Sequence, residues 1–230
     1  MNFDKPIEIS RKDNFGKNYY EVYSKKLKRI VRLFSSLRYA NFLTLEMDPT
    51  VIKFCERPLN IEIMLEGKNQ KTFIDFWVKF KDEREEMQEI GYIDEQKEND
   101  ENNDNSTHTQ ELIRRKKKWC EENNINFVIK TADDINSGRF YIRNLEYLSA
   151  KSRRYMPIDD NYYRPLVINA LKEHKKITIA DMIKFEILPC EHELDYLSYL
   201  FYEGIITLDI SNRPIDSKME VSLWQTNPLI

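Results

Sequence analysis

The stretch T-F-I-D-F-W-V-K-F-K-D-E-R-E-E-M-Q-E-I-G-Y, from Thr72 to Tyr92, decides the fold that the sequence predicts. Two runs of strand character, Phe73 to Phe80 and Met87 to Tyr92, flank a charged turn and indicate an antiparallel hairpin. Each run carries one acid on a face that should be buried, Asp75 and Glu89. A buried carboxylate needs a cation, a hydrogen-bond donor or a metal, and two converging carboxylates are the smallest set that binds a divalent metal. The pair therefore indicates either a metal site or two surface acids of a hairpin.

Strands and helices alternate around this hairpin, which predicts an α/β core of mixed sheet and flanking helices. The segment from Tyr19 to Phe34 is compatible with a hairpin or with the approach to a helix, and its periodicity leaves both open. The other expected elements are a helix from Ser35 or Ser36 to Asp48-Pro49, strands at 51–54, 59–65 and 127–130, and helices at 110–123 and 140–148. The segment after Tyr92 is almost free of apolar residues and is expected to be a mobile surface loop.

A second domain is expected after the basic linker that ends at Pro157. Three helical stretches, 164–174, 178–186 and 190–203, precede two strands at 205–210 and 219–224, an order typical of a winged-helix domain. We therefore predict domains at residues 1–155 and 156–230.

The net charge of −3 hides a strongly basic N-terminal arm. From Arg11 to Arg38 there are nine Lys or Arg against two acids, which favours contact with a polyanion over a merely solvated face. The residues predicted to bind DNA are Lys25, Lys26, Lys28, Arg29 and Arg32.

The C-terminal part, by contrast, is acidic, with seven Lys or Arg against twelve Asp or Glu from Ile158 to Ile230. The third helical stretch carries four acids and no Lys or Arg, so phosphates would repel it. We expect this domain to bind protein. Its aromatic residues Tyr196, Tyr199, Phe201 and Tyr202 fit either a core or an interface.

The three cysteines are far apart and lack metal-ligand spacing, so we expect reduced thiols in a cytoplasmic protein without a zinc site. No apolar run reaches membrane-spanning length, and the first residues lack the pattern of a signal peptide. No Gly-rich phosphate loop is present, so a nucleotide cofactor is not expected.

Residues 10 to 150 resemble the TnsA family, the endonuclease subunit of bacterial heteromeric cut-and-paste transposases. The order and spacing of several short segments carry the resemblance. These segments are Tyr23-Ser24, Arg29-Ile30-Val31, Ser35-Ser36-Leu37-Arg38-Tyr39, Leu45-Glu46-Met47-Asp48-Pro49, Phe54-Cys55-Glu56-Arg57-Pro58, Asp75-Phe76-Trp77-Val78, Gln88-Glu89-Ile90-Gly91-Tyr92 and Lys118-Trp119-Cys120.

The resemblance implies a restriction-endonuclease-like core that holds Mg²⁺ or Mn²⁺. It also implies transposon-end DNA and two proteins as partners, a TnsB-like transposase and a TnsC-like ATPase. In the family, an acid on the first helix, a strand Asp, and an acid or Gln two residues before a Lys form the catalytic set. Carried over, Asp75 and Glu89 are retained, whereas the helix acid falls at Arg38 and the Lys at Gly91.

An arginine at a metal-ligand position is worse than a missing ligand, because a guanidinium stays protonated. We expect Arg38 to pair with Asp75 or Glu89 instead. Glu95-Gln96-Lys97 offers an alternative acid-x-Lys spacing, but it lies where the strand gives way to the polar loop.

Three functions follow from these residues. The first is a TnsA-like subunit with a degenerate nuclease site that binds transposon ends and partner subunits, without a metal cofactor. The second is an active endonuclease that nicks transposon 5′ ends with Mg²⁺ or Mn²⁺ at Asp75 and Glu89. The third is a non-cutting regulator or decoy that binds the transposition ATPase.

Overall fold

The computed structural model describes residues 3–9, 16, 18–65, 67–91, 104–154 and 158–224. They form two compact units: unit 1 is Met1–Phe42 with Thr50–Ile135, and unit 2 is Leu43–Pro49 with Asn136–Ile230. The predicted boundary at residues 155 and 156 falls beside residues outside the described set, and it stays a prediction. No helix in the described ranges is long and apolar enough to cross a bilayer.

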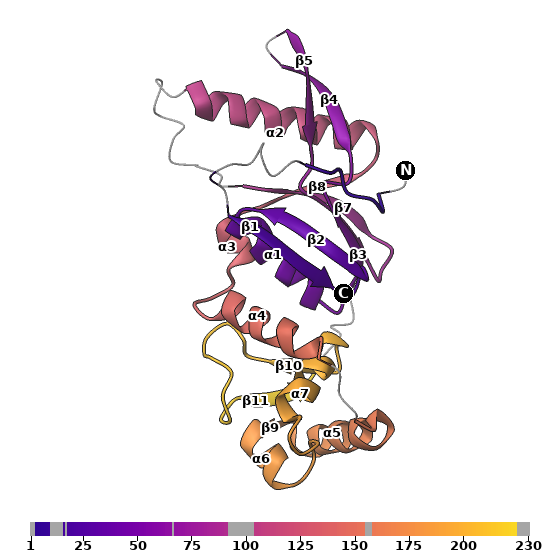
Figure 1. The fold of residues 1–230 in the computed structure, drawn as a ribbon, viewed down its shortest axis with the longest axis vertical. Helices are drawn as coiled ribbons and strands as arrows, with labels where there is room; N and C mark the ends of the chain where they lie inside the picture. Colours follow the sequence, from indigo (N-terminus) through magenta and orange to yellow (C-terminus); the bar gives the residue numbers. More distant parts are fainter. Residues whose placement is uncertain are drawn as a thin grey trace. The chain divides into compact units, whose positions relative to one another are not determined.

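Unit 1 is built on a four-stranded mixed sheet in the order β3-β6-β7-β8 (Figure 1). Its strands are β3 (Val51–Glu56), β6 (Phe76–Phe80), β7 (Glu85–Ile90) and β8 (Asn126–Lys130). β7 and β8 are parallel, and the other pairs are antiparallel. Two hairpins form separate two-stranded sheets, β1 (Tyr19–Ser24) with β2 (Arg29–Phe34), and β4 (Asn60–Leu65) with β5 (Lys68–Phe73). The segment from Tyr19 to Phe34, for which the sequence left both a hairpin and the approach to a helix open, is thus a hairpin.

Helices flank this sheet, which confirms the predicted α/β architecture. These helices are α1 (Ser36–Met47), which belongs to unit 1 up to Phe42, α2 (Asp104–Glu122) and the short α3 (Ala132–Ile135). Side chains alternate along β7, so Gln88 reaches Asn41 of α1 whereas Glu89 reaches Lys116 of α2. One strand therefore connects both helices.

The central hairpin formed as predicted, but its strands have different limits. Trp77 pairs with Met87 in an antiparallel register, and the second strand ends at Ile90. We expected the first strand to run from Phe73, whereas β5 ends there and β6 begins at Phe76. The interruption frees the Asp75 main chain, whose carbonyl accepts a hydrogen bond from the Arg57 amide at 2.8 Å. Asp75 therefore immediately precedes β6 and does not belong to the strand.

The core of unit 1 is aromatic and apolar. Phe42 of α1 packs edge-on against Phe54 of β3, at 5.8 Å between ring centroids. A second apolar cluster joins β4 and the sheet to α2 and includes Ile61, Trp77 and Cys120. Burial of large side chains at roughly 1.5–3 kcal/mol each fixes these elements in place.

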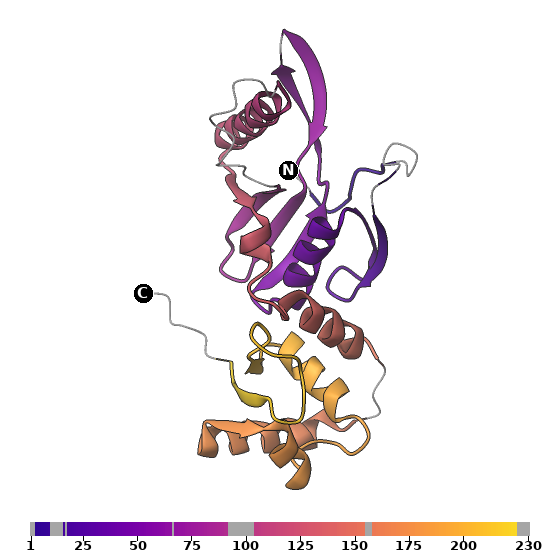
Figure 2. The same cartoon turned by 90° about the vertical axis from the view of Figure 1, so that its left-hand side faces the viewer.

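Unit 2 contains α4 (Tyr141–Ser152), α5 (Asp160–His174), α6 (Ile179–Lys184) and α7 (Glu193–Tyr202). Its antiparallel sheet has the order β10-β11-β9, with β9 (Lys176–Thr178), β10 (Ile206–Leu208) and β11 (Glu220–Leu223). Figure 2 shows the orange helices and yellow strands of this unit from a second side. The three predicted helices and the two predicted strands are present, and β9 was not predicted. The winged-helix assignment stays a prediction.

The aromatic residues of α7 divide between core and partial exposure. Tyr196 and Phe201 are buried, whereas Tyr199 and Tyr202 are only partly so. Helix α4 packs against α7, and Asp195 is buried in an ion pair with Lys151 at 3.0 Å. The helix for which the sequence left both a core and an interface role open is therefore largely covered within its own unit.

Gly138 is expected to be essential for the packing of unit 2. Its φ is +134°, and a Cβ there would lie 2.6 Å from the carbonyl oxygen of Ser211. Gly138→Ala should lower the free energy of unfolding by about 1–3 kcal/mol, through backbone strain and overpacking. Gly91→Ala is the matched control, since a Cβ at Gly91 would meet nothing within 4 Å. Urea denaturation of both variants tests this, and equal stabilities would contradict it.

Candidate functional site

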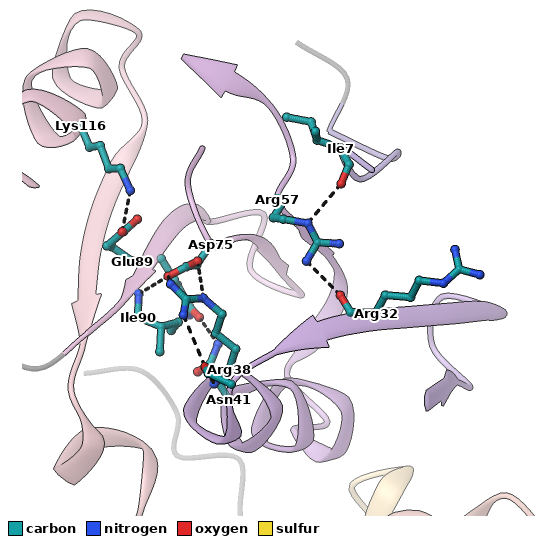
Figure 3. Close-up of polar contacts among 11 residues, drawn as sticks. Ile7, Arg32, Arg38, Asn41, Arg57, Asp75, Glu89, Ile90 and Lys116 are labelled. Carbon is teal, nitrogen blue, oxygen red and sulfur yellow. Dashed lines mark hydrogen bonds and ion pairs between the residues drawn. The ribbon is translucent and has the colours of Figure 1, made fainter. Parts of the chain in front are cut away.

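The four motif positions come from three parts of unit 1, and Figure 3 labels Arg38, Asp75 and Glu89. Arg38 lies in the first turn of α1, Asp75 immediately precedes β6, Glu89 is near the end of β7, and Gly91 follows β7. Strands β6 and β7 pair with Phe76 opposite Gln88, and this register brings Asp75 and Glu89 close enough to interact electrostatically. The predicted convergence of the two acids is confirmed.

Arg38 holds Asp75 with two hydrogen bonds. Its Nε donates to Oδ1 at 2.6 Å and its Nη2 donates to Oδ2 at 3.0 Å. The Ile90 amide donates to Oδ2 at 2.8 Å, and the Asp75 residue is only 2 % exposed. Burial opposes the charge of Arg38, but the attraction and hydrogen bonding of Asp75, together with the attraction of Glu89, outweigh it and raise the pKa of Arg38. The expected pairing of Arg38 with a motif acid is confirmed, and both Asp75 oxygens are occupied.

Glu89 is held by Lys116, a residue that the sequence analysis did not assign to the site. Lys116 Nζ lies 2.6 Å from Glu89 Oε1, and Lys116 is only 4 % exposed. A run of basic residues such as Arg114 to Lys118 is more often typical of a solvated helix surface. The missed signal is helical spacing, because Lys116 lies four residues after Leu112 and four before Cys120, on the apolar face of α2.

The surroundings of Glu89 disfavour the charged form of its carboxyl group. Burial, together with the charge of Asp75, raises the pKa of its carboxyl to about 7 despite the opposing effects of Lys116 and Arg38. Its Oε2 is buried without a hydrogen-bond partner among the described residues. An unsatisfied buried oxygen disfavours the charged form.

A hydrogen-bond network of polar and charged side chains lies on the other face of β7. Asn41 donates to Gln88 at 3.0 Å, Gln88 donates to Glu86 at 2.6 Å, and Arg84 donates to Glu86 at 3.2 Å. Asn41 is one turn beyond Arg38 on α1, so the network fixes the helix that presents Arg38. The sequence offered no signal for it, because each member is a common polar residue.

The donor set does not fit a divalent metal. The described ranges contain no group of three or more His, Cys, Asp or Glu placed to hold one. Arg38 covers both Asp75 oxygens, and one Glu89 oxygen is bound by Lys116. A dication would enter a site that already holds two cations. Whether the protein binds Mg²⁺ or Mn²⁺ stays a prediction.

Gly91 leaves open space where the family motif has a lysine. A Cβ there would meet nothing within 4 Å, and its φ is not in the left-handed region. The alternative motif Glu95-Gln96-Lys97 lies outside the described residues, as does the expected loop after Tyr92.

The residues predicted to bind DNA lie on the β1–β2 hairpin. Arg29 forms a bidentate pair with Glu56, at 2.8 and 2.6 Å, and Arg32 pairs with Glu21 at 2.8 Å. Lys25, Lys26 and Lys28 lie in the turn between the strands. Arg29 is thus engaged within unit 1, and the role of all five in DNA binding stays a prediction.

Residues 48–132 match the family model described as TnsA-like endonuclease N terminal. The match includes Asp75, Glu89, Gly91 and Lys116, whereas Arg38 lies before it. The TnsA resemblance is therefore confirmed, and over this stretch the chain is similar to TnsA-like endonuclease N-terminal domains. Among curated proteins, no chain matches the sequence.

Replacing the buried pair Glu89–Lys116 should change how stability depends on pH. The Glu89 pKa rises from an ordinary 4.5 to about 7 in the folded protein. The folded state therefore holds this proton more tightly, and the Glu89 contribution to stability decreases as pH rises from about 4.5 to about 7. In the double variant Glu89→Gln, Lys116→Met, this decrease, on the order of 3 kcal/mol, should be absent.

Urea denaturation from pH 4.5 to 7.5 measures the effect. Glu62→Gln, at an exposed acid, is the control and should keep the wild-type profile. Parallel profiles for the double variant and the wild type would show that Glu89 does not titrate in this window.

Proposed function

We propose that this chain is a TnsA-like subunit of a heteromeric DNA transposase whose nuclease site is silenced. It binds transposon-end DNA and partner subunits, and it leaves strand cleavage to another component. The observation that carries the proposal is the bidentate contact of Arg38 with Asp75.

The silencing has an electrostatic cause. A positive charge about 5 Å from a dication costs roughly 6–7 kcal/mol at an effective dielectric of about 20. Arg38 stays charged at any physiological pH, so it supplies permanently the positive charge that a metal would bring to Asp75.

The cation beside the acids also comes from another element than the one that the family motif implies. Gly91 has no side chain to orient an attacking water, and the nearby cation is Lys116 from α2. Because Lys116 is buried in an ion pair with Glu89, it neutralises that acid and does not act as a separate catalytic cation. Both changes remove catalytic capacity and leave each of the two acids paired with a cation.

Binding functions follow from the two units taken separately. The basic turn of the β1–β2 hairpin supports contact with DNA phosphates. In unit 2, the order of α5, β9, α6, α7, β10 and β11 supports a winged-helix-like domain. Its third helix is covered by α4 and carries no Lys or Arg, which favours protein partners, a TnsB-like transposase and a TnsC-like ATPase.

One observation favours the active endonuclease as a second candidate. Among the described residues, Glu89 Oε2 is buried without a partner, as a ligand oxygen would be before a metal binds, and Lys116 lies beside it. In that case Arg38 would have to leave Asp75 when DNA and metal bind.

Restoring the family residues should restore metal-dependent cutting if Arg38 and Gly91 silence the site. Arg38→Glu with Gly91→Lys creates the full catalytic set, and the open space at Gly91 accommodates the lysine. We expect Mg²⁺-dependent nicking of supercoiled plasmid to rise at least about 100-fold above wild type. The same double change with Asp75→Ala is the control and should not nick. Nicking by the wild type equal to that of the restored variant would support the active endonuclease instead.

Direct metal binding gives an independent test. Calorimetric titration of Mn²⁺ into the wild type should show no binding at 1 mM, because Arg38 occupies both Asp75 oxygens. Arg38→Gln, which removes that cation, should bind measurably. Wild-type binding that disappears in Asp75→Ala would contradict the silenced site.

A further inference from the structure

Arg57 is a buried arginine beside the site that the motif analysis does not use. It follows β3 directly, is 6 % exposed, and has a φ of +46°, in the left-handed region. Its amide donates to the Asp75 carbonyl at 2.8 Å, and its own carbonyl accepts from the Ile7 amide at 2.9 Å. The main chain therefore holds Arg57 rigidly next to Asp75.

Within the described part of the chain, the guanidinium of Arg57 is bound only by uncharged partners. Its Nε donates to the Ile7 carbonyl at 3.1 Å, and its Nη1 donates to the Arg32 carbonyl at 2.9 Å (Figure 3). Its Nη2 has no acceptor within the described ranges. This atom is also not among the fully buried atoms without a partner there, so it borders accessible space.

The neighbouring carboxylates are already paired with other cations. These pairs are Arg29 with Glu56, Arg38 with Asp75, and Lys116 with Glu89. Arg57 therefore carries the one positive charge in this cluster of described residues that has no ion-pair partner. Burial lowers the pKa of Arg57, and the attraction of Glu56 and Asp75 does not cancel that effect. A buried charge in this position is stabilised by an anion.

A small cavity beside Arg57 provides room for that anion. It has a volume of about 50 Å³, more than the roughly 10–15 Å³ that one water needs. Arg38, Arg57 and Asp75 line it, together with apolar side chains that include Leu33 and Phe73. Asp75 does not repel an anion fully, because Arg38 and the Ile90 amide cover its oxygens.

Both arginines keep donors for a ligand. Arg38 Nη1 makes only a long contact of 3.4 Å with Ser35 Oγ, and Arg57 Nη2 is unpartnered among the described residues. Guanidinium groups match the geometry of phosphate oxygens. A phosphodiester carries one negative charge, which equals the single unpaired charge of this cluster.

We propose that Arg57 and Arg38 bind one phosphodiester group of the DNA backbone in this cavity. The inference rests on the proposed function, since it assumes that unit 1 binds DNA. The site that would hold a metal in a nuclease would then hold the backbone itself, through two arginines.

The salt dependence of DNA binding tests the proposal. Fluorescence anisotropy with a 30-bp duplex at several salt concentrations gives the slope of log K against log[salt]. Arg57→Gln should reduce this slope by about one and weaken binding about tenfold at 0.1 M salt. Arg164→Gln is the matched control, because Arg164 lies in unit 2 and is already held by Asp160, and it should keep the wild-type slope. A wild-type slope and affinity in Arg57→Gln would overturn the proposal.

Inorganic phosphate tests whether the cavity binds the DNA backbone or free phosphate. This test can be made on the wild type alone. Millimolar phosphate should raise the melting temperature of the wild type relative to chloride at equal ionic strength, and should compete with the duplex. Arg57→Lys, which keeps the charge but loses the planar fork, should keep the slope and lose affinity. If Arg57→Gln does not fold, this variant and the phosphate titration decide. The proposal is overturned if Arg57→Lys keeps the wild-type affinity and phosphate does not raise the melting temperature of the wild type.

The outcomes also separate this inference from the proposed function. A wild type that binds no duplex would contradict both the proposed function and this inference. Duplex binding that is unchanged in Arg57→Gln would sink the inference alone. Phosphate stabilisation that Arg57→Gln abolishes, with unchanged DNA affinity, would assign the cavity to free phosphate and overturn the DNA backbone as its ligand.

Discussion

The contact of Arg38 with Asp75 is the interaction on which the candidate site depends. It joins the first turn of α1 to the start of β6, and the Ile90 amide adds the end of β7 to the same carboxylate. Three elements that are distant in sequence thus meet at two oxygen atoms. A bidentate charge-assisted pair sets distance and orientation together, which a single hydrogen bond does not.

The surrounding charges follow from this contact. With Asp75 neutralised from α1, Glu89 needs its own cation, and α2 supplies Lys116. Buried ion pairs gain little net stability, because desolvation offsets most of their attraction. Their effect here is specific geometry: α1 and α2 are each tied to β7 by a polar contact, through Gln88 and Glu89. A TnsA-like scaffold can therefore keep its architecture while its acids serve internal pairing.

Much of the site was predictable, because it depends on local patterns. The alternation in 73–92 indicated the hairpin, and period two placed Asp75 and Glu89 on converging positions. The misplaced Arg38 in the first turn of α1 predicted an acid partner. The limits of the first strand were wrong, because the Asp75 main chain bonds to Arg57 and so leaves the strand before β6. That bond involves a residue 18 positions earlier, which no local pattern reports.

The sequence by itself determined the α/β class, the central hairpin and the TnsA resemblance. These properties are encoded in residue type and short-range spacing. Only the tertiary structure decided that Lys116 turns inward to Glu89, that Arg29 pairs with Glu56, and that Arg57 has no ion-pair partner among the described residues. The physical reason is that a charged side chain takes its partner from whatever packing brings within about 3 Å. Packing between distant segments is set by the whole core.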